Sequence, residues 1–455
     1  MVLPGVRSFS IIEAPLKKLG MNAASRYFLL AGLILVAFAA AAFKVFNRPP
    51  LAAFEVPVTR VLPRAALTVA DGSPGFKSEF VSSVPGKAVH APSLVELRDG
   101  SLRAVWFSGS REGAGDVTIQ TAVLGQASRQ WGPESSLFDR NQLQRGLQRY
   151  IKKIGNPVIA RATDGSLHLW MVNVSLGGWA GSAISWSRSL DDGATWSAPK
   201  RLVTSPFLNI STLVKAPPVL MTQGQTSLPV YHEFITKFAE VLRLNGDGRV
   251  IDKVRLSGSQ TSLQPVVLAN SAQTAQAFMR ATQGGRVVSS TTTDAGQSWS
   301  NAAATDSPNP NSALAGLVLQ DGSRWLALNP TQAGREKLAL IKLGDAAGKS
   351  ADAEFGLEPP AQNQSLASPL TLGDHAAVLG AELKSKGVSE LQIAAYIASA
   401  QRQLCGDTYC AQEFSYPYML QTRNGNLHLV YTWHRTRIKH IQMDPSNLLS
   451  PGSGS

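Results

Sequence analysis

Short apolar runs separated by turn signals make up most of the chain after residue 55, and long helical periodicity is mostly absent. Four segments share one pattern, in which an apolar strand runs through an Asp-Gly or Asn-Gly turn into a second strand: VELRDGSLRAVWF, VIARATDGSLHLWMV, LVLQDGSRWLALN and MLQTRNGNLHLVYTW. Glycine at the second turn position accepts positive φ without a Cβ clash, so these dipeptides favour tight hairpins. The pattern predicts an all-β domain whose hairpins turn at Gly100, Gly165, Gly322 and Gly425.

A second pattern lies out of phase with the hairpins. SLDDGATWSAP and TTDAGQSWSNA place a hydroxyl residue, Asp, Gly, a hydroxyl residue and Trp in the same order, and GQASRQWGPES is a degenerate copy. Trp131, Trp196 and Trp299 are separated by 65 and 103 residues, and the hairpin glycines repeat both intervals. A unit of about 50 to 65 residues suits a four-stranded propeller blade, and the longer interval suits two blades. Residues 55–448 are therefore predicted to form a β-propeller of six or seven blades.

The N-terminal part of the chain does not follow this rhythm. Residues 27–43, YFLLAGLILVAFAAAAF, carry no charge and follow four Lys or Arg residues. About 17 apolar residues are the lower limit for a membrane-spanning helix and slightly exceed the core of a cleavable signal peptide. A membrane anchor, a cleavable signal peptide and a buried helix therefore all remain as alternatives. We expect a cytoplasmic segment at 1–26, a single-pass inner-membrane anchor at 27–46 and a linker at 47–54. The propeller would then lie in the periplasm, or be secreted if the segment is cleaved.

Charge narrows the classes of partner. The chain has 455 residues, 44% of them hydrophobic, and a formal net charge of +12 at pH 7. The first 50 residues hold six Lys or Arg and one Glu, which leaves +7 spread over the rest without a concentrated basic block. A diffuse positive charge favours an acidic glycan or a membrane surface over nucleic acid. We expect no nucleic-acid partner and no cofactor.

The segment 375–410 also departs from the rhythm of the blades. SELQIAAYIASAQRQL begins with Ser389 as an N-cap, which predicts a helical insertion that caps a blade edge, docks a protein partner or shapes the substrate groove. The only two cysteines, Cys405 and Cys410, follow directly. Their close spacing after an export signal indicates a disulfide, and without nearby paired histidines they make a poor zinc site, so no metal is expected. Residues 449–455 are expected to form a flexible tail.

The second repeated pattern resembles the Asp-box of sialidases. In such a turn the Asp side chain accepts backbone N–H bonds, the Gly takes the left-handed conformation and the Trp packs between strands. A structural role is favoured over a metal site or catalysis, and the resemblance places the motif on the face away from the active site. The residues concerned are Ser189, Asp191, Gly193, Thr195 and Trp196, then Thr292, Asp294, Gly296, Ser298 and Trp299.

Further stretches carry a wider resemblance: HAPSLVELRDGSLRAVWFSGSREGAGDVTIQTA, GNPVIA, LPVYHE, LQPVV, AFMR, NPNS and FSYPYMLQTRNGNLHLVYTWHRTRIKH. With them, residues 88–448 resemble the sialidase-like superfamily, in its branch of repeat-containing neuraminidase-like proteins. Sialidases hold the substrate carboxylate with three arginines, attack with a tyrosine activated by a glutamate, and use an aspartate as acid/base. The resemblance implies an exo-acting glycosidase.

Carried over by position, the resemblance implies Tyr416 as nucleophile, Glu233 as its base and Asp116 as acid/base. Guanidinium groups bind carboxylates bidentately, and a phenol of pKa ~10 needs a base before it attacks an anomeric carbon. Arginines at 111, 280 and 435 would form the clamp. The full set of expected substrate-binding residues is Arg111, Glu112, Asn156, Tyr231, His232, Gln264, Arg280, Asn309, Asn311, Tyr418 and Arg435. Because side chains alternate along a strand, Arg435 is expected to share a strand face with Arg437 and Lys439. This face would be either a solvated strand edge or a glycan-binding stripe.

One position departs from the sialidase pattern. His90 begins His-Ala-Pro where sialidases have an arginine of the clamp. A histidine can act as acid or base near neutral pH. The same branch includes proteins that look like uronate-specific lyases, in which a base removes the proton α to a carboxylate, and His90, Tyr231 and His232 suit that chemistry. Three functions stay open: hydrolysis of a glycosidic bond to an acidic sugar, lyase cleavage, and a non-catalytic glycan-binding or scaffold subunit of a membrane assembly.

Overall fold

The computed structural model describes residues 23–46, 52–56, 76–205, 209–344, 351–358 and 369–448. The chain divides into two units, Met1–Leu51 and Ala52–Ser455. In the first unit, α2 (Ala23–Phe46) contains the apolar run. Of the residues described, none belongs to a helix long and apolar enough to cross a membrane. The anchor at 27–46 stays a prediction, and most of the cytoplasmic segment, part of the linker and the C-terminal tail lie outside the described residues.

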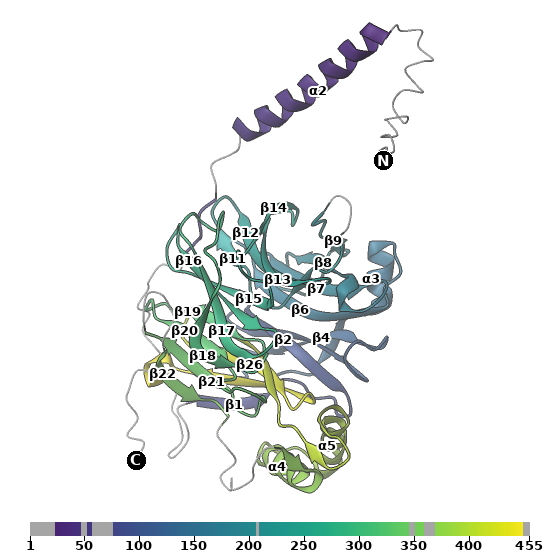
Figure 1. The fold of residues 1–455 in the computed structure, drawn as a ribbon. Helices are drawn as coiled ribbons and strands as arrows, with labels where there is room; N and C mark the ends of the chain where they lie inside the picture. Colours follow the sequence, from purple (N-terminus) through teal and green to yellow (C-terminus); the bar gives the residue numbers. More distant parts are fainter. Residues whose placement is uncertain are drawn as a thin grey trace, which may run out of the picture. The chain divides into compact units, whose positions relative to one another are not determined.

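Among the described residues of the second unit, six antiparallel sheets of four or five strands form the blades, beside one two-stranded sheet (Figure 1). The innermost strands of neighbouring sheets contact one another in sequence order, and the first inner strand also contacts the last, so the sheets close into a six-bladed propeller. This confirms the predicted fold class and fixes the blade number at six. The four predicted hairpin glycines lie between the first and second strands of blades 1, 2, 5 and 6, with φ of 85°, 80°, 82° and 90°.

The blades follow the chain, and each begins with its innermost strand. Blade 1 holds β2 (Ala88–Glu96), β3 (Leu102–Gly109), β4 (Thr118–Leu124) and β5 (Ser135–Phe138). Blade 2 holds β6 (Lys153–Arg161), β7 (Leu167–Val174), β8 (Ser182–Ser189) and β9 (Lys200–Arg201). Blade 3 holds β10 (Leu213–Val214), β11 (Val219–Met221), β12 (Gln225–Glu233), β13 (Lys237–Leu244) and β14 (Val250–Arg255).

The second half of the ring has the same construction. Blade 4 holds β15 (Ser262–Ala269), β16 (Ala275–Ala281), β17 (Gly285–Thr292) and β18 (Ala303–Asn309). Blade 5 holds β19 (Ala315–Val318), β20 (Arg324–Leu328), β21 (Ala339–Leu343) and β22 (Ala351–Gly356). Blade 6 holds β25 (Phe414–Gln421), β26 (Leu427–Trp433), β27 (Arg437–Met443) and β1 (Phe76–Phe80).

Blade 6 closes the ring, because it combines strands from both ends of the second unit. The first strand, β1, pairs antiparallel with the last, β27, from Phe76 opposite Met443 to Phe80 opposite Lys439. A second tie joins blades 6 and 1, where the Arg423 guanidinium lies 3.1 Å from the Glu96 carboxylate. Separating the two ends would therefore break a sheet as well as an interface between blades.

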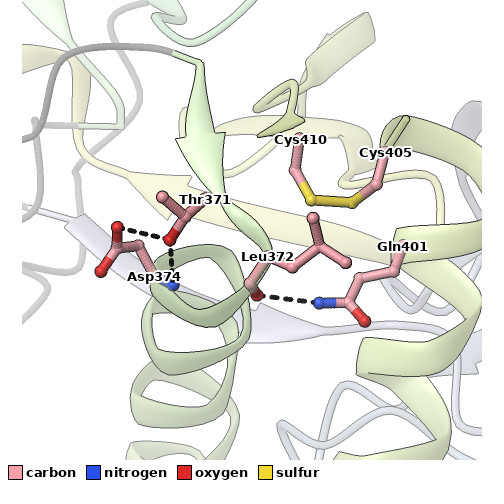
Figure 2. Close-up of a disulfide and its surroundings, with 6 residues drawn as sticks. All are labelled: Thr371, Leu372, Asp374, Gln401, Cys405 and Cys410. Atoms are coloured by element: carbon pink, nitrogen blue, oxygen red, sulfur yellow. Dashed lines mark hydrogen bonds between the residues drawn. A yellow bond between two sulfur atoms is a disulfide. The ribbon is translucent and has the colours of Figure 1, made fainter. Parts of the chain in front are cut away.

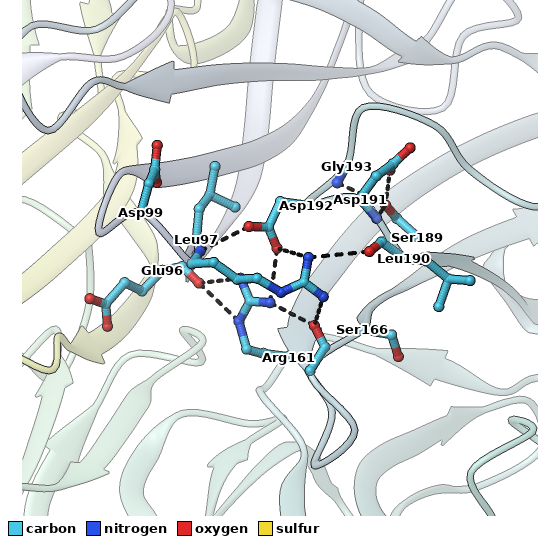
Figure 3. Close-up of polar contacts among 12 residues, drawn as sticks. Glu96, Leu97, Asp99, Arg161, Ser166, Ser189, Leu190, Asp191, Asp192 and Gly193 are labelled. Carbon is cyan, nitrogen blue, oxygen red and sulfur yellow. Dashed lines mark hydrogen bonds and ion pairs between the residues drawn. The ribbon is translucent and has the colours of Figure 1, made fainter.

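The two Asp-boxes form closed turns between the third and fourth strands of blades 2 and 4. Asp191 accepts hydrogen bonds from the backbone and hydroxyl of Thr195, and the Gly193 N–H donates to Ser189. The next residue, Asp192, lies 2.9 Å from a guanidinium nitrogen of Arg161 at the C-terminal end of β6 (Figure 3). Asp192 also accepts the backbone N–H of residue 98, which follows β2. This turn therefore lies at the C-terminal ends of the inner strands.

A two-helix insertion separates blades 5 and 6. It contains α4 (Leu372–Ser385) and α5 (Glu390–Leu404), with α5 starting directly after Ser389 as predicted. The short strands β23 (Leu370–Thr371) and β24 (Tyr409–Cys410) pair beside the helices, and the Cys405–Cys410 disulfide is present, which confirms that prediction (Figure 2). The sequence did not predict α4, nor α3 (Arg140–Leu147) between blades 1 and 2.

Buried charges attach the insertion to blade 6. The Lys439 ammonium lies 2.5 Å from carboxylate oxygens of both Glu358 and Glu382, and Tyr431 donates to Glu358. The Arg437 guanidinium lies over the ring of Tyr396 of α5, 4.4 Å from its centroid. The prediction of an exposed or glycan-binding stripe is wrong for these two cations, because the insertion covers them.

The buried ion cluster yields a stability test. Burial raises the pKa of Glu358, and the positive charge of Lys439 partly offsets this effect. We expect Lys439→Ala to lower the free energy of unfolding by about 3–5 kcal/mol, because it leaves two carboxylates without their cation. Guanidinium denaturation measures the change. As a control, Lys342→Ala breaks a partly exposed pair with Asp352 and should lose less than about 1 kcal/mol. Equal losses in the two variants would contradict a structural role for the cluster.

Candidate active site at the propeller axis

A left-handed residue interrupts four inner strands near their N-terminal ends. Ala91, Asn156, Gln264 and Tyr416 have φ of 54°, 36°, 52° and 55°, and a proline follows each of them. The pairing register of the strand shifts at each of these positions. Non-glycine residues rarely adopt positive φ, and bulges of this kind redirect side chains and gather next to active sites. The four strands therefore present side chains at a common end of the propeller.

The polar side chains of these bulges meet around a pair of phenols. The Gln264 amide donates to the Tyr416 hydroxyl at 3.0 Å and to the Tyr231 hydroxyl at 3.4 Å. The Asn156 amide donates to Tyr231 at 3.3 Å. The Arg280 guanidinium, at the end of β16, donates to the Gln264 carbonyl oxygen at 3.1 Å. Blades 2, 3, 4 and 6 are thereby joined in one network.

Three guanidinium groups, from blades 4, 5 and 6, are linked through Asn311 and Glu413. Arg280 donates to the Asn311 side chain at 2.6 Å, and Arg335 donates to the Asn311 backbone oxygen at 3.1 Å. Arg335 and Arg435 also bind the two oxygens of Glu413 at 3.1 and 2.9 Å. Burial alone would raise the pKa of Glu413, but these two cations more than reverse the effect and lower it to about 2. Glu413 is therefore a permanent counterion.

The three cations differ in how far they are neutralised. Arg435 binds a second carboxylate, Glu112 of blade 1, at 3.1 Å. Arg280 binds only the neutral side chains of Gln264 and Asn311 and, in the part of the chain that the structure describes, forms no ion pair. A guanidinium without a counterion retains its charge for a ligand, and its fork fits a carboxylate. Arg280 is therefore the guanidinium best placed to bind an anionic ligand.

His90 packs directly against Tyr416. The two ring centroids are 4.1 Å apart, and His90 is buried. Burial, followed by the positive charge of Arg435, holds the pKa of His90 well below its usual range. Its Nδ1 has no hydrogen-bond partner among the residues described. The imidazole is therefore neutral and can accept a proton, and its lowered pKa makes it a weaker base than an ordinary histidine.

A buried lysine lies beneath the same tyrosine. Lys215, in the segment between β10 and β11, donates to the Pro417 carbonyl oxygen at 2.7 Å. Its ammonium lies 5.7 Å from the ring centroid of Tyr416 and 5.8 Å from that of Tyr418. Burial lowers the pKa of Lys215 to about 7. The lysine therefore fixes the backbone after Tyr416 and can exist in either charge state near neutrality.

Two of the proposed catalytic carboxylates lie apart from the Tyr416 hydroxyl. Asp116 accepts hydrogen bonds at 2.9 Å from the backbone and the hydroxyl of Ser110, in the exposed loop after β3. Glu233 ends β12, and burial raises its pKa. Its charge acts on Arg280 and Tyr231, but within the described ranges no hydrogen bond joins it to Tyr416.

Four of the expected binding residues also lie outside the network. Arg111 is exposed in the blade 1 loop. His232 stacks on Phe238 with centroids 4.5 Å apart. Asn309 is fully buried and donates to the Ser312 carbonyl oxygen, and Tyr418 donates to the Ile159 carbonyl oxygen. The network thus includes Glu112, Asn156, Tyr231, Gln264, Arg280, Asn311, Tyr416 and Arg435 of the predicted residues, together with His90 in contact with it.

Sequence analysis did not single out Lys215, Arg335 or Glu413. Lys215 had a signal, because it is the only charge in the apolar run STLVKAPPVLM. Glu413 lies three residues before Tyr416, directly before a stretch that carries the family resemblance. Arg335 lies in a loop with no motif, and only the fold brings it to the axis.

An apolar cavity occupies the opposite end of the axis. It has a volume of about 490 Å³ and is lined by inner strands, including Leu94, Ile159 and Val267. Glu96 and Arg423 at its rim come from the face that carries the blade 2 Asp-box. The Tyr416 network and this cavity therefore lie at different ends of the ring.

The comparisons with known proteins agree with this architecture. The family model of the BNR repeat-like domain matches residues 100–429. A Hadza microbial sialidase, Hz136, shares 15% identity at a TM-score of 0.57, over 79% of this chain and 66% of its own length, just under two thirds. A leech intramolecular trans-sialidase, in complex with 2,7-anhydro-Neu5Ac, shares 11% identity at a TM-score of 0.56, over 84% of this chain and 71% of its own.

A protein of unknown function from Dyadobacter fermentans DSM 18053 shares 10% identity at a TM-score of 0.57, over 81% of this chain and 99% of its own. No curated protein matches the sequence. At these identities the solved structures show a common fold alone. The family model spans well over half of the chain, and the six blades are arranged as in sialidases. The chain belongs to the BNR repeat-like family and has a sialidase-like propeller fold.

Proposed function

We propose that the protein cleaves a glycosidic bond of an acidic glycan at the Tyr416 network. The observation that carries the proposal is the position of Arg280, which forms no ion pair among the described residues and reaches the Tyr416 hydroxyl through a single amide, Gln264. A sugar carboxylate bound to Arg280 would place the sugar beside the phenol. Related propellers include a sialidase and a trans-sialidase, which supports a glycan as substrate class.

The arrangement favours elimination over hydrolysis. In this route the neutral His90 removes the proton α to the substrate carboxylate, and Arg280 stabilises the negative charge that develops. Electrons then form a C=C bond as the glycosidic C–O bond breaks, and the Tyr416 hydroxyl protonates the departing oxygen. Each step uses a group already in contact with the network. The products are an unsaturated acidic sugar and a free hydroxyl on the leaving chain.

Hydrolysis is the second candidate, because the sequence resemblance assigns Tyr416 as the nucleophile and the related structures include sialidases. That route needs a carboxylate to accept the proton of the phenol. Glu413 is engaged by two arginines, and Glu233 would have to move toward Tyr416. The two routes differ in whether water enters the product.

Catalysis is tested with a panel of acidic glycans. We expect Tyr416→Phe to reduce turnover by about 10²–10⁴-fold, because it removes the proton donor. Arg280→Ala should lose activity on glycans that carry a carboxylate. For elimination, products formed in oxygen-18 water should contain no label and should show the ultraviolet absorbance of a conjugated C=C bond.

The matched control is Tyr409→Phe, which alters an exposed tyrosine in the insertion and should keep full activity. Label in the new reducing end would replace elimination with hydrolysis. Turnover that survives both Tyr416→Phe and Arg280→Ala would remove the site from consideration. Saturable glycan binding with no product from the panel would point to a binding subunit.

Lys215 provides a pH test that needs no substrate. The pKa of Lys215 in the folded protein is about 7, against about 10.4 in an unfolded chain. Between these values the unfolded chain binds more protons, so stability rises with pH, by at most about 1.4 kcal/mol per pH unit. Lys215→Met should remove this rise in denaturant unfolding between pH 7 and 10, while Lys87→Met, at an exposed site, should keep it. Parallel curves for wild type and Lys215→Met would show that Lys215 stays charged.

We further propose that residues 27–46 anchor the propeller in the inner membrane, with the propeller in the periplasm. The proposal rests on the uncharged run at 27–43 and the basic residues before it. An uncleaved anchor should leave the protein in the membrane fraction with the mass of the full chain. A mature N-terminus beyond residue 43 would identify a cleaved signal peptide instead.

A further inference from the structure

A buried histidine without partners lies beside the disulfide. His375, in the first turn of α4, is 0% exposed, and neither of its ring nitrogens has a hydrogen-bond partner among the described residues. Buried polar atoms almost always have partners, so two orphaned nitrogens on one ring require an explanation.

The nearest donor atoms belong to the two cysteines. One ring nitrogen of His375 and the Sγ atoms of Cys405 and Cys410 all lie within 4.8 Å of one another. In a tetrahedral zinc site, with Zn–S of about 2.3 Å and Zn–N of about 2.0 Å, ligand atoms lie roughly 3.3–3.8 Å apart. The four residues between the cysteines also match the spacing common in structural zinc sites. Small shifts would bring all three atoms to one ion.

A second buried histidine lies on the adjoining turn. His434, between β26 and β27, is buried, and its ring centroid lies 5.4 Å from that of His375. Its Nδ1 has no partner within the described part of the chain. The prediction of a poor zinc site relied on the absence of histidines near the cysteines in sequence. Folding places two there, from positions 30 residues before and 24 residues after the pair.

We propose that the reduced protein binds one zinc ion through His375, Cys405, Cys410 and His434. A dithiol reductant would supply two electrons and two protons to open the disulfide and would itself become a disulfide. Zinc binding then releases both thiol protons. Cys405 is half-buried and residues 406–409 are exposed, so a reductant can reach the bond. The oxidised protein has no thiolates and does not bind the ion. The insertion would therefore be crosslinked by the disulfide in the oxidised protein and by the zinc ion in the reduced protein.

The site adjoins the Tyr416 network without sharing residues with it. The His434 backbone N–H donates to the Glu413 carbonyl oxygen at 2.7 Å, and the next residue is Arg435. Zinc on His434 would hold this turn in place. The proposal does not depend on what the network catalyses, and its test measures metal binding.

The test uses cobalt as a spectroscopic probe for zinc. Protein reduced with a phosphine and desalted without oxygen is titrated with Co²⁺. We expect one equivalent to bind, with the visible bands of tetrahedral cobalt and a thiolate-to-cobalt charge-transfer band, both lost when Zn²⁺ is added. The oxidised protein should show neither band. His375→Ala and His434→Ala should each weaken binding by more than the ~10–100-fold typical of losing an outer-shell partner.

The matched control is His168→Ala in blade 2. His168 is also buried with an unpartnered ring nitrogen, but it packs against Trp170 and Trp186. It should leave cobalt binding unchanged. Equal binding by oxidised and reduced wild type, or unchanged affinity in His375→Ala, would overturn the proposal. If the alanine variants do not fold, the Co²⁺ titration of the reduced wild-type protein still tests the proposal. Absence of the charge-transfer band there would show that the protein has no thiolate metal site.

Discussion

The pairing of β1 with β27 is the constraint on which the rest of the structure depends. Each inner strand pairs with the second strand of its own blade and packs between two neighbouring inner strands, so the side chains at the axis converge fully only when the ring is closed. Closure also brings β2 beside β25, which places His90 against Tyr416 across 326 residues of sequence. The insertion reinforces the same blade through the buried cluster around Lys439. The site therefore depends on contacts made at the junction of the two ends of the propeller.

The three arginines at the axis differ in the number of carboxylates that they bind. Glu413 forms ion pairs with both Arg335 and Arg435, and Arg435 has a second carboxylate partner in Glu112. Among the described residues, Arg280 binds only amide groups. The buried ion pairs keep two guanidinium groups in fixed positions, since removing one partner would leave an uncompensated charge. Among the described residues, Arg280 forms no ion pair, so it differs from the other two guanidinium groups in keeping its charge without a bound carboxylate.

The sequence was most informative where a local rule applied. Each hairpin glycine needs a left-handed turn and each Asp-box closes its own turn, so repeats of these short patterns were enough to predict a propeller. The helix α5 followed from Ser389 and its alanine-rich run. In contrast, Lys439 looked exposed because its partners, Glu358 and Glu382, lie 81 and 57 residues away.

The residues of the candidate site also fall into two groups, those that the local sequence identified and those that only contacts between blades revealed. Tyr416 and Arg280 were identified from stretches that resemble a known family, and the network contains both. The pairing of Glu413 with Arg335 and Arg435, the position of Lys215 under the tyrosine and the separation of Asp116 from the phenol arise from contacts between blades. No spacing within one strand encodes such contacts. For the same reason the sequence alone did not predict that two histidines lie near the cysteines.

The left-handed residues before the prolines have one further consequence. At Ala91, Asn156, Gln264 and Tyr416 the backbone conformation is fixed by the bulge and the ring of the next residue, whatever side chain is present. Branching at Cβ is disfavoured there, but long, polar or aromatic groups fit. The side chains of Asn156, Gln264 and Tyr416 belong to one hydrogen-bond network. A change of side chain at any of these positions would therefore alter the network while the pairing of the strands is kept.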